Sequence, residues 1–145
     1  MIRTEIDIVI DRPAEAVFDV LSDLSRNPTW QNGMKSCVWT SDPPVGVGSS
    51  YEQIAEFAGR EIRSTFEVAE YEPGSRIKAT TIESSFPITF TRWVEAIDDS
   101  TTRVRAIIEG DASGFFRLME RFMAPMVRRS IRGDYARLKA LLEEA

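Results

Sequence analysis

Residues 115–142 read FFRLMERFMAPMVRRSIRGDYARLKALL, and this stretch decides the fold. Its apolar side chains recur at intervals of three and four residues, which is the spacing of one face of an α-helix. These side chains are Phe115, Leu118, Met119, Phe122, Met126, Ile131, Tyr135, Leu138, Leu141 and Leu142. The pattern predicts one long amphipathic helix. Pro125 lies inside it, and its missing N–H and its ring should bend or interrupt the helix near residues 121–124.

Strand patterns dominate the chain before this helix. Residues 2–10 carry isoleucine or threonine at every second position, and this alternation predicts a half-buried strand. Six further runs are rich in β-branched and aromatic residues. The seven predicted strands cover residues 2–10, 36–41, 50–58, 61–70, 76–84, 87–97 and 102–111. Most of the connections are short, and short connections require antiparallel neighbours.

Two short helices are predicted between the first and the second strand. Asp11 and Pro13 form a helix start signal, and Asn27 before Pro28 disfavours continuation, so the first helix should end near Ser25. Residues 27–32, which include Trp30, can form a second short helix. Helices and strands are thus segregated along the chain, which is typical of the α+β class.

Composition and charge limit the class of protein. The chain of 145 residues, with 43% hydrophobic and 28% charged residues, is expected to form one globular domain over residues 1–145. No stretch approaches the roughly 20 apolar residues that span a bilayer, and no signal sequence precedes the first strand, so we expect a cytoplasmic protein. The net charge of −5 argues against a nucleic-acid partner. The basic residues Arg128, Arg129, Arg132 and Arg137 are interpreted as a solvated helix face.

The chain contains no histidine and a single cysteine, Cys37. A catalytic Ser-His-Asp triad, a Cys-His pair and a histidine-ligated metal are therefore excluded, and we expect neither a metal site nor a cofactor. Any acid–base chemistry would fall to a carboxylate, a tyrosine or a lysine with a perturbed pKa. Cys37 has no partner for an internal disulfide, which agrees with a reducing compartment.

Residues 11–23 read DRPAEAVFDVLSD, and Pro28 and Trp30 follow. After an N-terminal strand, this opening resembles that of the polyketide cyclase/dehydrase branch of the START-like (SRPBCC) superfamily. Later motifs agree with the family in order and spacing; they are Val47-Gly48, FEV at 66–68, YEPG at 71–74, TRV at 102–104 and Leu138-Lys139. The resemblance covers the whole chain. It implies a helix-grip fold, in which a seven-stranded curved antiparallel sheet surrounds a long kinked C-terminal helix, with two short helices after the first strand.

A cavity is expected inside this fold. One helix is too thin to fill a strongly twisted seven-stranded sheet along its length, so a gap should remain where the helix starts. The resemblance likewise implies a deep cavity open at one end, and the phenylalanine and methionine residues early in the helix would suit varied apolar ligands. The predicted ligand-binding residues are Trp30, Tyr51, Phe57, Phe66, Phe90, Arg92, Trp93, Glu95, Phe115, Met119, Phe122, Met123 and Met126. Any one of the helical residues among them could instead belong to ordinary core packing.

The strand at 87–97 leaves two orientations open. Alternation places Phe90 and Arg92 on one face and Trp93 and Glu95 on the other. If Glu95 faces inward, desolvation should raise its pKa, and it would anchor a ligand or act as a general acid or base. If it faces outward, it is a surface acid that pairs across the hairpin. Arg92 has the opposite status: inward it would hold the polar head of a lipid-like ligand, and outward it would be solvated.

Three functions remain open at this level. The first is a carrier or binding protein for an apolar small molecule such as a lipid, a polyketide or a similar metabolite, as a monomer or a homodimer. The second is a polyketide cyclase/dehydratase-type enzyme that acts within the same cavity, where confinement and orientation lower the barrier to cyclisation. The third is a protein-interaction module whose interface lies between Phe115 and Met126.

Overall fold

The computed structural model describes residues 1–57, 59–111 and 115–145, with side chains from residue 120 onward in the last segment. Seven strands and three helices make up these segments. Their order is β1 (Ile2–Ile10), α1 (Ala14–Ser22), η1 (Leu24–Thr29), β2 (Met34–Trp39), β3 (Ser50–Phe57), β4 (Arg60–Glu72), β5 (Arg76–Glu83), β6 (Ile88–Asp98), β7 (Thr101–Gly110) and α2 (Phe115–Glu143). The predicted strands are all present, and their ends differ from the prediction by a few residues.

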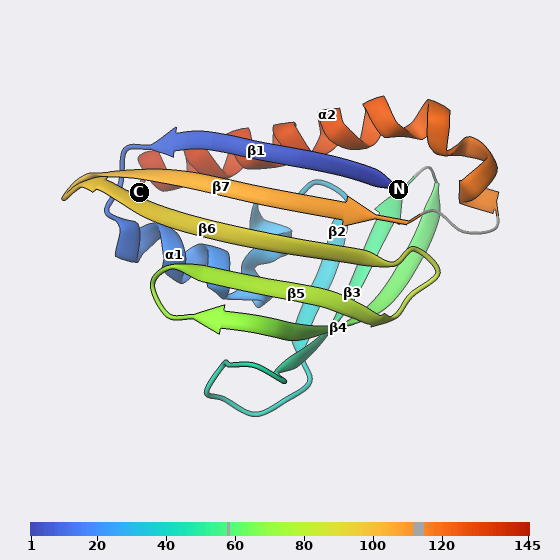
Figure 1. The fold of residues 1–145 in the computed structure, drawn as a ribbon, viewed down its shortest axis with the longest axis horizontal. Helices are drawn as coiled ribbons and strands as arrows, with labels where there is room; N and C mark the ends of the chain where they lie inside the picture. The colour runs from blue at the N-terminus through green and yellow to red at the C-terminus, as the bar shows by residue number, and fades with distance from the viewer. Residues whose placement is uncertain (58, 112–114) are drawn as a thin grey trace.

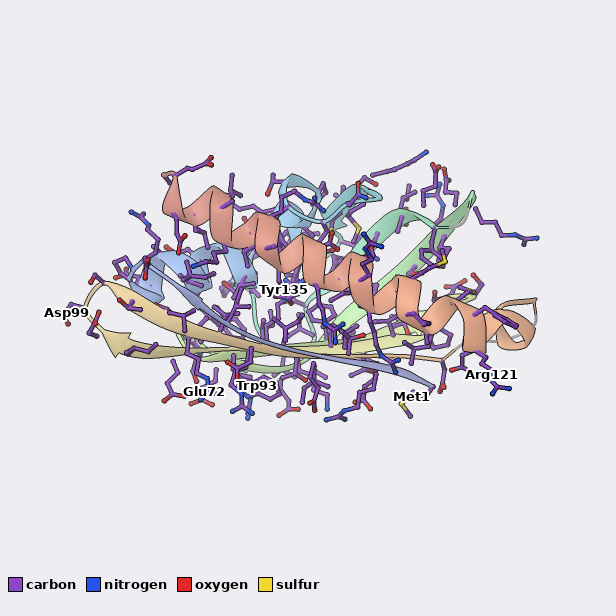
Figure 2. The ribbon with its side chains drawn as sticks, turned by 90° about the horizontal axis from the view of Figure 1, so that it is seen from above. Met1, Glu72, Trp93, Asp99, Arg121 and Tyr135 are labelled. Carbon is purple, nitrogen blue, oxygen red and sulfur yellow. The ribbon has the colours of Figure 1, made fainter. Side chains whose placement is uncertain are left out.

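The seven strands form one antiparallel sheet in the order β1-β7-β6-β5-β4-β3-β2. Each strand therefore pairs with its neighbour in the sequence, except that β1 returns to pair with β7. Figure 1 shows the sheet curling, so that β2 and β3 run steeply across the direction of β1, β6 and β7. The long helix α2 lies along β1 on the concave side of the sheet, as the view from above shows (Figure 2). This arrangement confirms the predicted α+β helix-grip fold.

The short helices differ from the prediction in detail. The helix α1 ends at Ser22, and a 3-10 helix, η1, begins at Leu24, because the Asp23 side chain accepts a hydrogen bond from the Ser25 N–H (3.3 Å). Pro28 lies inside η1, and Trp30 is the residue that ends it. The second short helix therefore starts earlier than the predicted range of 27–32.

The helix α2 continues through Pro125 without interruption. Its ribbon bends near its start (Figure 1), as expected for a helix in which the proline leaves the carbonyl of Arg121 without its usual donor. In the described part of the chain, no helix is long and apolar enough to cross a membrane.

Two groups of buried side chains form most of the core. The first joins β1, β6, β7 and α1 to the second half of α2; among its members are Ile10, Val17, Leu21, Val104 and Leu138. The second lies on the concave face of β3 to β6; among its members are Tyr51, Phe66, Val68, Ile77 and Phe90. The rings of Tyr51 and Phe66 stack with their centroids 4.9 Å apart. The space between the second group and the middle of α2 is only partly filled.

Candidate functional site

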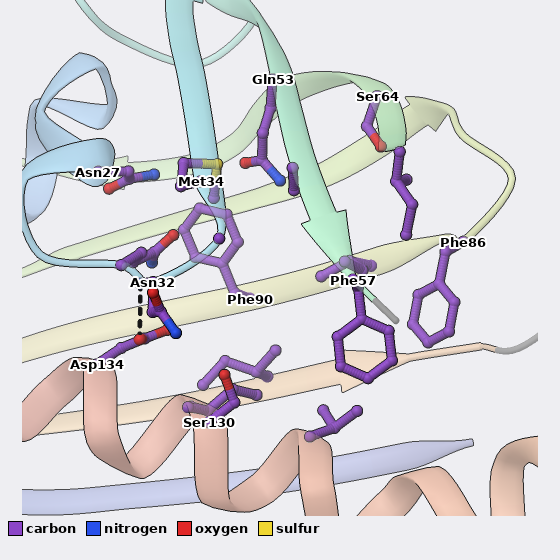
Figure 3. A pocket seen from close by; sticks show the side chains of 18 of the residues that line it. Asn27, Asn32, Met34, Gln53, Phe57, Ser64, Phe86, Phe90, Ser130 and Asp134 are labelled. Atoms are coloured by element: carbon purple, nitrogen blue, oxygen red, sulfur yellow. Dashed lines mark hydrogen bonds between the residues drawn. The ribbon is translucent and has the colours of Figure 1, made fainter. Parts of the chain in front are cut away.

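A pocket of about 210 Å³ lies between the concave face of the sheet and the middle of α2 (Figure 3). The turn at residues 31–34 forms one side of it, and residues 127–135 of α2 form the opposite side. Asn32, Glu56 and Ser130 line the pocket and are also exposed, so the opening lies where the turn, the end of β3 and the helix meet. The pocket lies farther along α2 than the predicted gap, because Met123 packs with Ile2 and Phe86 nearer the start of the helix.

Most of the wall is apolar. Strands β3, β4 and β6 contribute Phe57, Phe66 and Phe90, and Phe86 comes from the connection before β6. Residues two positions apart in a strand point to the same face, so Phe90 and Arg92 of β6 both reach the pocket. An apolar wall with a few convergent polar groups is typical of a small-molecule site.

A buried cation forms the inner end of the pocket. The side chain of Arg92 lines the pocket although the residue is only 3% exposed. Its Nη1 donates to the carbonyl oxygen of Leu21 (2.9 Å) and to Oδ1 of Asn27 (3.1 Å). Its guanidinium carbon lies 4.5 Å from the ring centroid of Phe90 and 5.0 Å from that of Trp30.

In the part of the chain that the structure describes, no carboxylate forms an ion pair with this guanidinium. Among the described residues, none of the ion pairs involves Arg92, and its Nε has no hydrogen-bond partner. The guanidinium is therefore held by neutral dipoles and by ring faces alone. A buried charge in such surroundings costs free energy, and an anionic or strongly accepting group brought near it would recover part of that cost.

Tyr135 of α2 lies beside Arg92. Burial raises the pKa of its phenol, and the Arg92 guanidinium, which also hydrogen-bonds the phenol, opposes part of that rise. Its ring meets the edge of Trp30 at a centroid distance of 5.0 Å. The phenol is thus a neutral group that stays protonated at neutral pH, next to the buried cation.

Asp134 links the turn at residues 31–34, at the opening of the pocket, to α2. Its Oδ1 accepts hydrogen bonds from the Asn32 N–H (2.9 Å) and from Nη2 of Arg137 (2.8 Å), and Figure 3 shows the first of these. Nε of Arg137 also donates to the carbonyl of Trp30 (3.1 Å). Burial raises the pKa of the Asp134 carboxyl, while these two hydrogen bonds lower it. Asp134 lines the pocket, so it is also the carboxyl best placed for proton transfer there.

Other polar side chains reach the pocket without forming a metal site. Gln53 and Ser64 line it, and Oγ of Ser64 lies 2.7 Å from Oγ of Ser84. Nowhere in residues 1–57, 59–111 and 120–145 do three acidic or cysteine side chains converge as metal ligands would. Cys37 is buried, and burial raises the pKa of its thiol to about 12.

The family model for polyketide cyclase/dehydrase and lipid transport matches residues 1–143. The chain belongs to this family. The resemblance read from residues 11–30 and from the later motifs is therefore confirmed. No curated protein sequence matches the chain.

Solved structures of low sequence identity share the fold of this polyketide cyclase/dehydrase family member. A Thermus thermophilus protein superposes with a TM-score of 0.81 and 16% identity, over 97% of this chain and 96% of that one. The Zhui aromatase/cyclase of a Streptomyces species has a TM-score of 0.80 and 15% identity, over 97% and 93%. A START superfamily protein from Mycobacterium smegmatis has a TM-score of 0.76 and 15% identity, over 99% and 96%. At these identities the likeness concerns the fold alone.

Four of the predicted ligand-binding residues line the pocket of this protein. They are Phe57, Phe66, Phe90 and Arg92. Two more stand behind the wall: Trp30 packs on Tyr135 and Arg92, and Tyr51 packs on Phe66. The binding role of all six stays a prediction.

Trp93 and Glu95 lie on the convex face of the sheet, which corrects their placement in the wall. Figure 2 shows Trp93 on the side of the sheet that faces away from α2. Its ring centroid lies 5.9 Å from the guanidinium carbon of Arg105. Glu95 is exposed and lies opposite Arg103 in the β6–β7 register. The inward face of β6 is set by its pairing with β5 and β7, which alternation alone does not give.

The helical candidates are also corrected in part. Met123 is buried but belongs to the apolar group beside the pocket, whereas Phe122 and Met126 are 73% and 57% exposed on the outer face of α2. The side chains of Phe115 and Met119 lie outside the described residues.

Several polar residues of the pocket, above all Asn27, Gln53 and Asp134, are not among the residues predicted from the sequence. The sequence predicts Tyr135 only as part of the apolar face of the helix. The sequence does contain one indication: Asp134 immediately precedes Tyr135, so the pattern places an acidic side chain at the edge of the buried face of the helix.

Proposed function

We propose that the protein binds a small, largely apolar molecule with an acidic or strongly accepting group, and that this group contacts Arg92. The observation that carries the proposal is the buried guanidinium at the inner end of an apolar pocket, which has no carboxylate partner among the residues that the structure describes. The phenol of Tyr135 offers a second donor at the same place. Membership of a family described as polyketide cyclase/dehydrase and lipid transport supports a ligand-binding role.

The volume limits the ligand. Pockets for drug-sized molecules usually measure about 300–1,000 Å³, and this one measures about 210 Å³. A bicyclic aromatic acid or a short acyl chain fits that space. A longer molecule would have to extend through the opening beside Asn32 and Ser130. Binding and release through this opening, without any chemical step, amount to a carrier function.

A matched pair of probes tests this proposal. The affinities of 2-naphthoate and 2-naphthamide, which differ in charge but hardly in shape, are measured by isothermal titration calorimetry. We expect 2-naphthoate to bind at least about tenfold more tightly, because hydrogen bonds to an ionised acceptor are stronger than those to a neutral one. Equal affinities for the two probes, or no binding of either, would overturn the proposal.

Two variants assign the effect to the inner end of the pocket. Arg92→Met should remove the preference for 2-naphthoate while keeping an apolar side chain of similar length. Arg105→Met removes a cation from the convex face and should leave both affinities unchanged. Circular dichroism checks that each variant is folded. If a variant does not fold, the comparison of the two probes on the unaltered protein still tests the proposal.

A second candidate is a cyclase-type enzyme that uses the same pocket. The observation that favours it is Asp134, a pocket carboxyl whose pKa is raised by burial, one residue before the phenol of Tyr135. Such a pair would take a proton from an activated methylene group and return one to a carbonyl oxygen. With a poly-β-carbonyl thioester analogue, Asp134→Asn and Tyr135→Phe should abolish cyclised product while the analogue still binds. If no cyclised product forms with the unaltered protein, the enzyme candidate is rejected and the carrier proposal is unaffected.

A further inference from the structure

The outer face of α2 carries a patch that the pocket does not explain. We call Arg121, Phe122, Met126, Arg129 and Arg132 the outer patch. Phe122, Met126 and Arg129 follow one another at intervals of four and three residues, so they share one face of the helix. The large exposed fractions of Phe122 and Met126, 73% and 57%, leave most of their apolar surface in water. Figure 2 shows Arg121 at the end of the molecule where α2 begins.

The charge of this segment is opposite to that of the chain. Residues 121–132 contain four arginines and no acidic residue, whereas the whole chain has a net charge of −5. Among the described residues, Arg121, Arg129 and Arg132 form no ion pair with a carboxylate. Arg128 completes the segment, and its Nε donates to the neutral carbonyl of Arg3. The segment is therefore a local cationic surface on an acidic protein.

The outer patch borders the opening of the pocket. Val127, Ser130 and Ile131 line the pocket from the same turns of α2 that carry Met126 and Arg129. Ser130 is both exposed and part of the opening. A surface that covers the outer patch would thus lie next to the opening.

We propose that the outer patch docks this protein onto the surface of a lipid bilayer that contains anionic lipids. Cationic side chains flanking protruding aromatic and thioether side chains on one helix are the chemistry of interfacial binding. The arginines are attracted by the lipid head groups, and Phe122 and Met126 enter the boundary with the acyl chains. A second copy of the chain is disfavoured as the partner, because two such surfaces repel each other. A bilayer surface needs only protruding cationic and apolar groups, and Phe122, Met126 and the arginines supply both.

Vesicle co-flotation tests the docking without any pocket ligand. The protein is mixed with vesicles of equimolar phosphatidylglycerol and phosphatidylcholine, or with phosphatidylcholine alone. We expect binding to the anionic vesicles that weakens as salt is added, and little binding to the neutral ones. Arg129→Gln with Arg132→Gln should weaken binding about 25-fold at low salt, since one basic residue near the surface contributes about fivefold. Phe122→Ser with Met126→Ser should weaken it about tenfold or more.

Matched controls make the same changes elsewhere. Val38→Ser with Ile97→Ser removes two side chains that are as exposed as Met126, and Arg26→Gln with Arg63→Gln removes two exposed charges. Both controls should bind anionic vesicles like the unaltered protein.

Three results would overturn the docking proposal. The first is equal binding to neutral and anionic vesicles, and the second is no difference between the patch variants and their controls. The third is a loss confined to the arginine variant together with full competition by poly-glutamate, because that result would indicate an acidic protein as the partner. None of these results bears on the naphthoate test, so the two proposals fail separately.

Discussion

Gly33 sets a sharp test of the structure at the opening of the pocket. Its φ angle of 82° is in the left-handed region, where a Cβ costs about 1–2 kcal/mol. A Cβ added there would lie 2.8 Å from the carbonyl oxygen of Glu56, and that oxygen belongs to the backbone and cannot turn away. The necessary shift would weaken the 2.7 Å hydrogen bond from the Glu56 N–H to the Gly33 carbonyl, worth about 0.5–1.5 kcal/mol. Gly33→Ala should therefore destabilise the protein by about 2–4 kcal/mol.

Urea unfolding followed by circular dichroism measures this loss, provided that the dependence of the free energy on urea is unchanged in the variant. Gly48→Ala is the matched control, because Gly48 also has a positive φ of 92° but an added Cβ would meet no atom within 4 Å. Gly48→Ala should lower the free energy of unfolding only by the cost of a Cβ in the left-handed conformation, about 1–2 kcal/mol. If Gly33→Ala is no more destabilising than Gly48→Ala, the close approach of the turn to β3 is wrong.

Three further predictions concern buried groups. Tyr51→Phe should stabilise the protein by about 1 kcal/mol in urea unfolding, because the buried Tyr51 hydroxyl has no hydrogen-bond partner among the described residues; a loss of stability would reveal a partner. Since burial raises the pKa of the Cys37 thiol to about 12, iodoacetamide should leave it unmodified at neutral pH until urea unfolds the protein, and rapid native labelling would contradict its burial. The pKa of Asp134 is raised in the folded state, so the contribution of the protonated carboxyl to stability is complete at low pH and is lost as the pH rises through that pKa. The stability of Asp134→Asn relative to the unaltered protein, measured by urea unfolding, should therefore increase above about pH 4. A decrease in that relative stability would contradict the raised pKa.

The fold could be predicted because its signals are local. Alternation along residues 2–10 and the three- and four-residue spacing of residues 115–142 report which side of an element is buried, and they do so without knowledge of any partner. Short connections then fix antiparallel neighbours. The pairing of β1 with β7 was not predicted, since no local pattern joins strands so far apart in the sequence.

The pocket was harder to predict because its contacts are long-range. Arg92 is held by Asn27, which lies 65 residues earlier, and Asp134 binds the N–H of Asn32 across 102 residues. Neither pair leaves a periodic trace in the sequence. The exposure of Phe122 and Met126 is a similar case: both fit the apolar spacing of the helix, but only the curvature of the sheet decides where the buried face of α2 stops.

The buried charge of Arg92 connects the two proposals chemically. A methionine at this position would fill the same space without the free energy needed to remove a guanidinium from water, so the site is less favourable for stability alone than an apolar one. A ligand that compensates the charge and also fills the apolar walls is an amphiphile, with an acidic head and an apolar body. Amphiphiles of this kind concentrate at the boundary between water and a bilayer, which is where the outer patch would hold the opening of the pocket. If both proposals hold, the amphiphilic character of the ligand accounts for the cation inside the pocket and for the cations and exposed apolar side chains beside its opening.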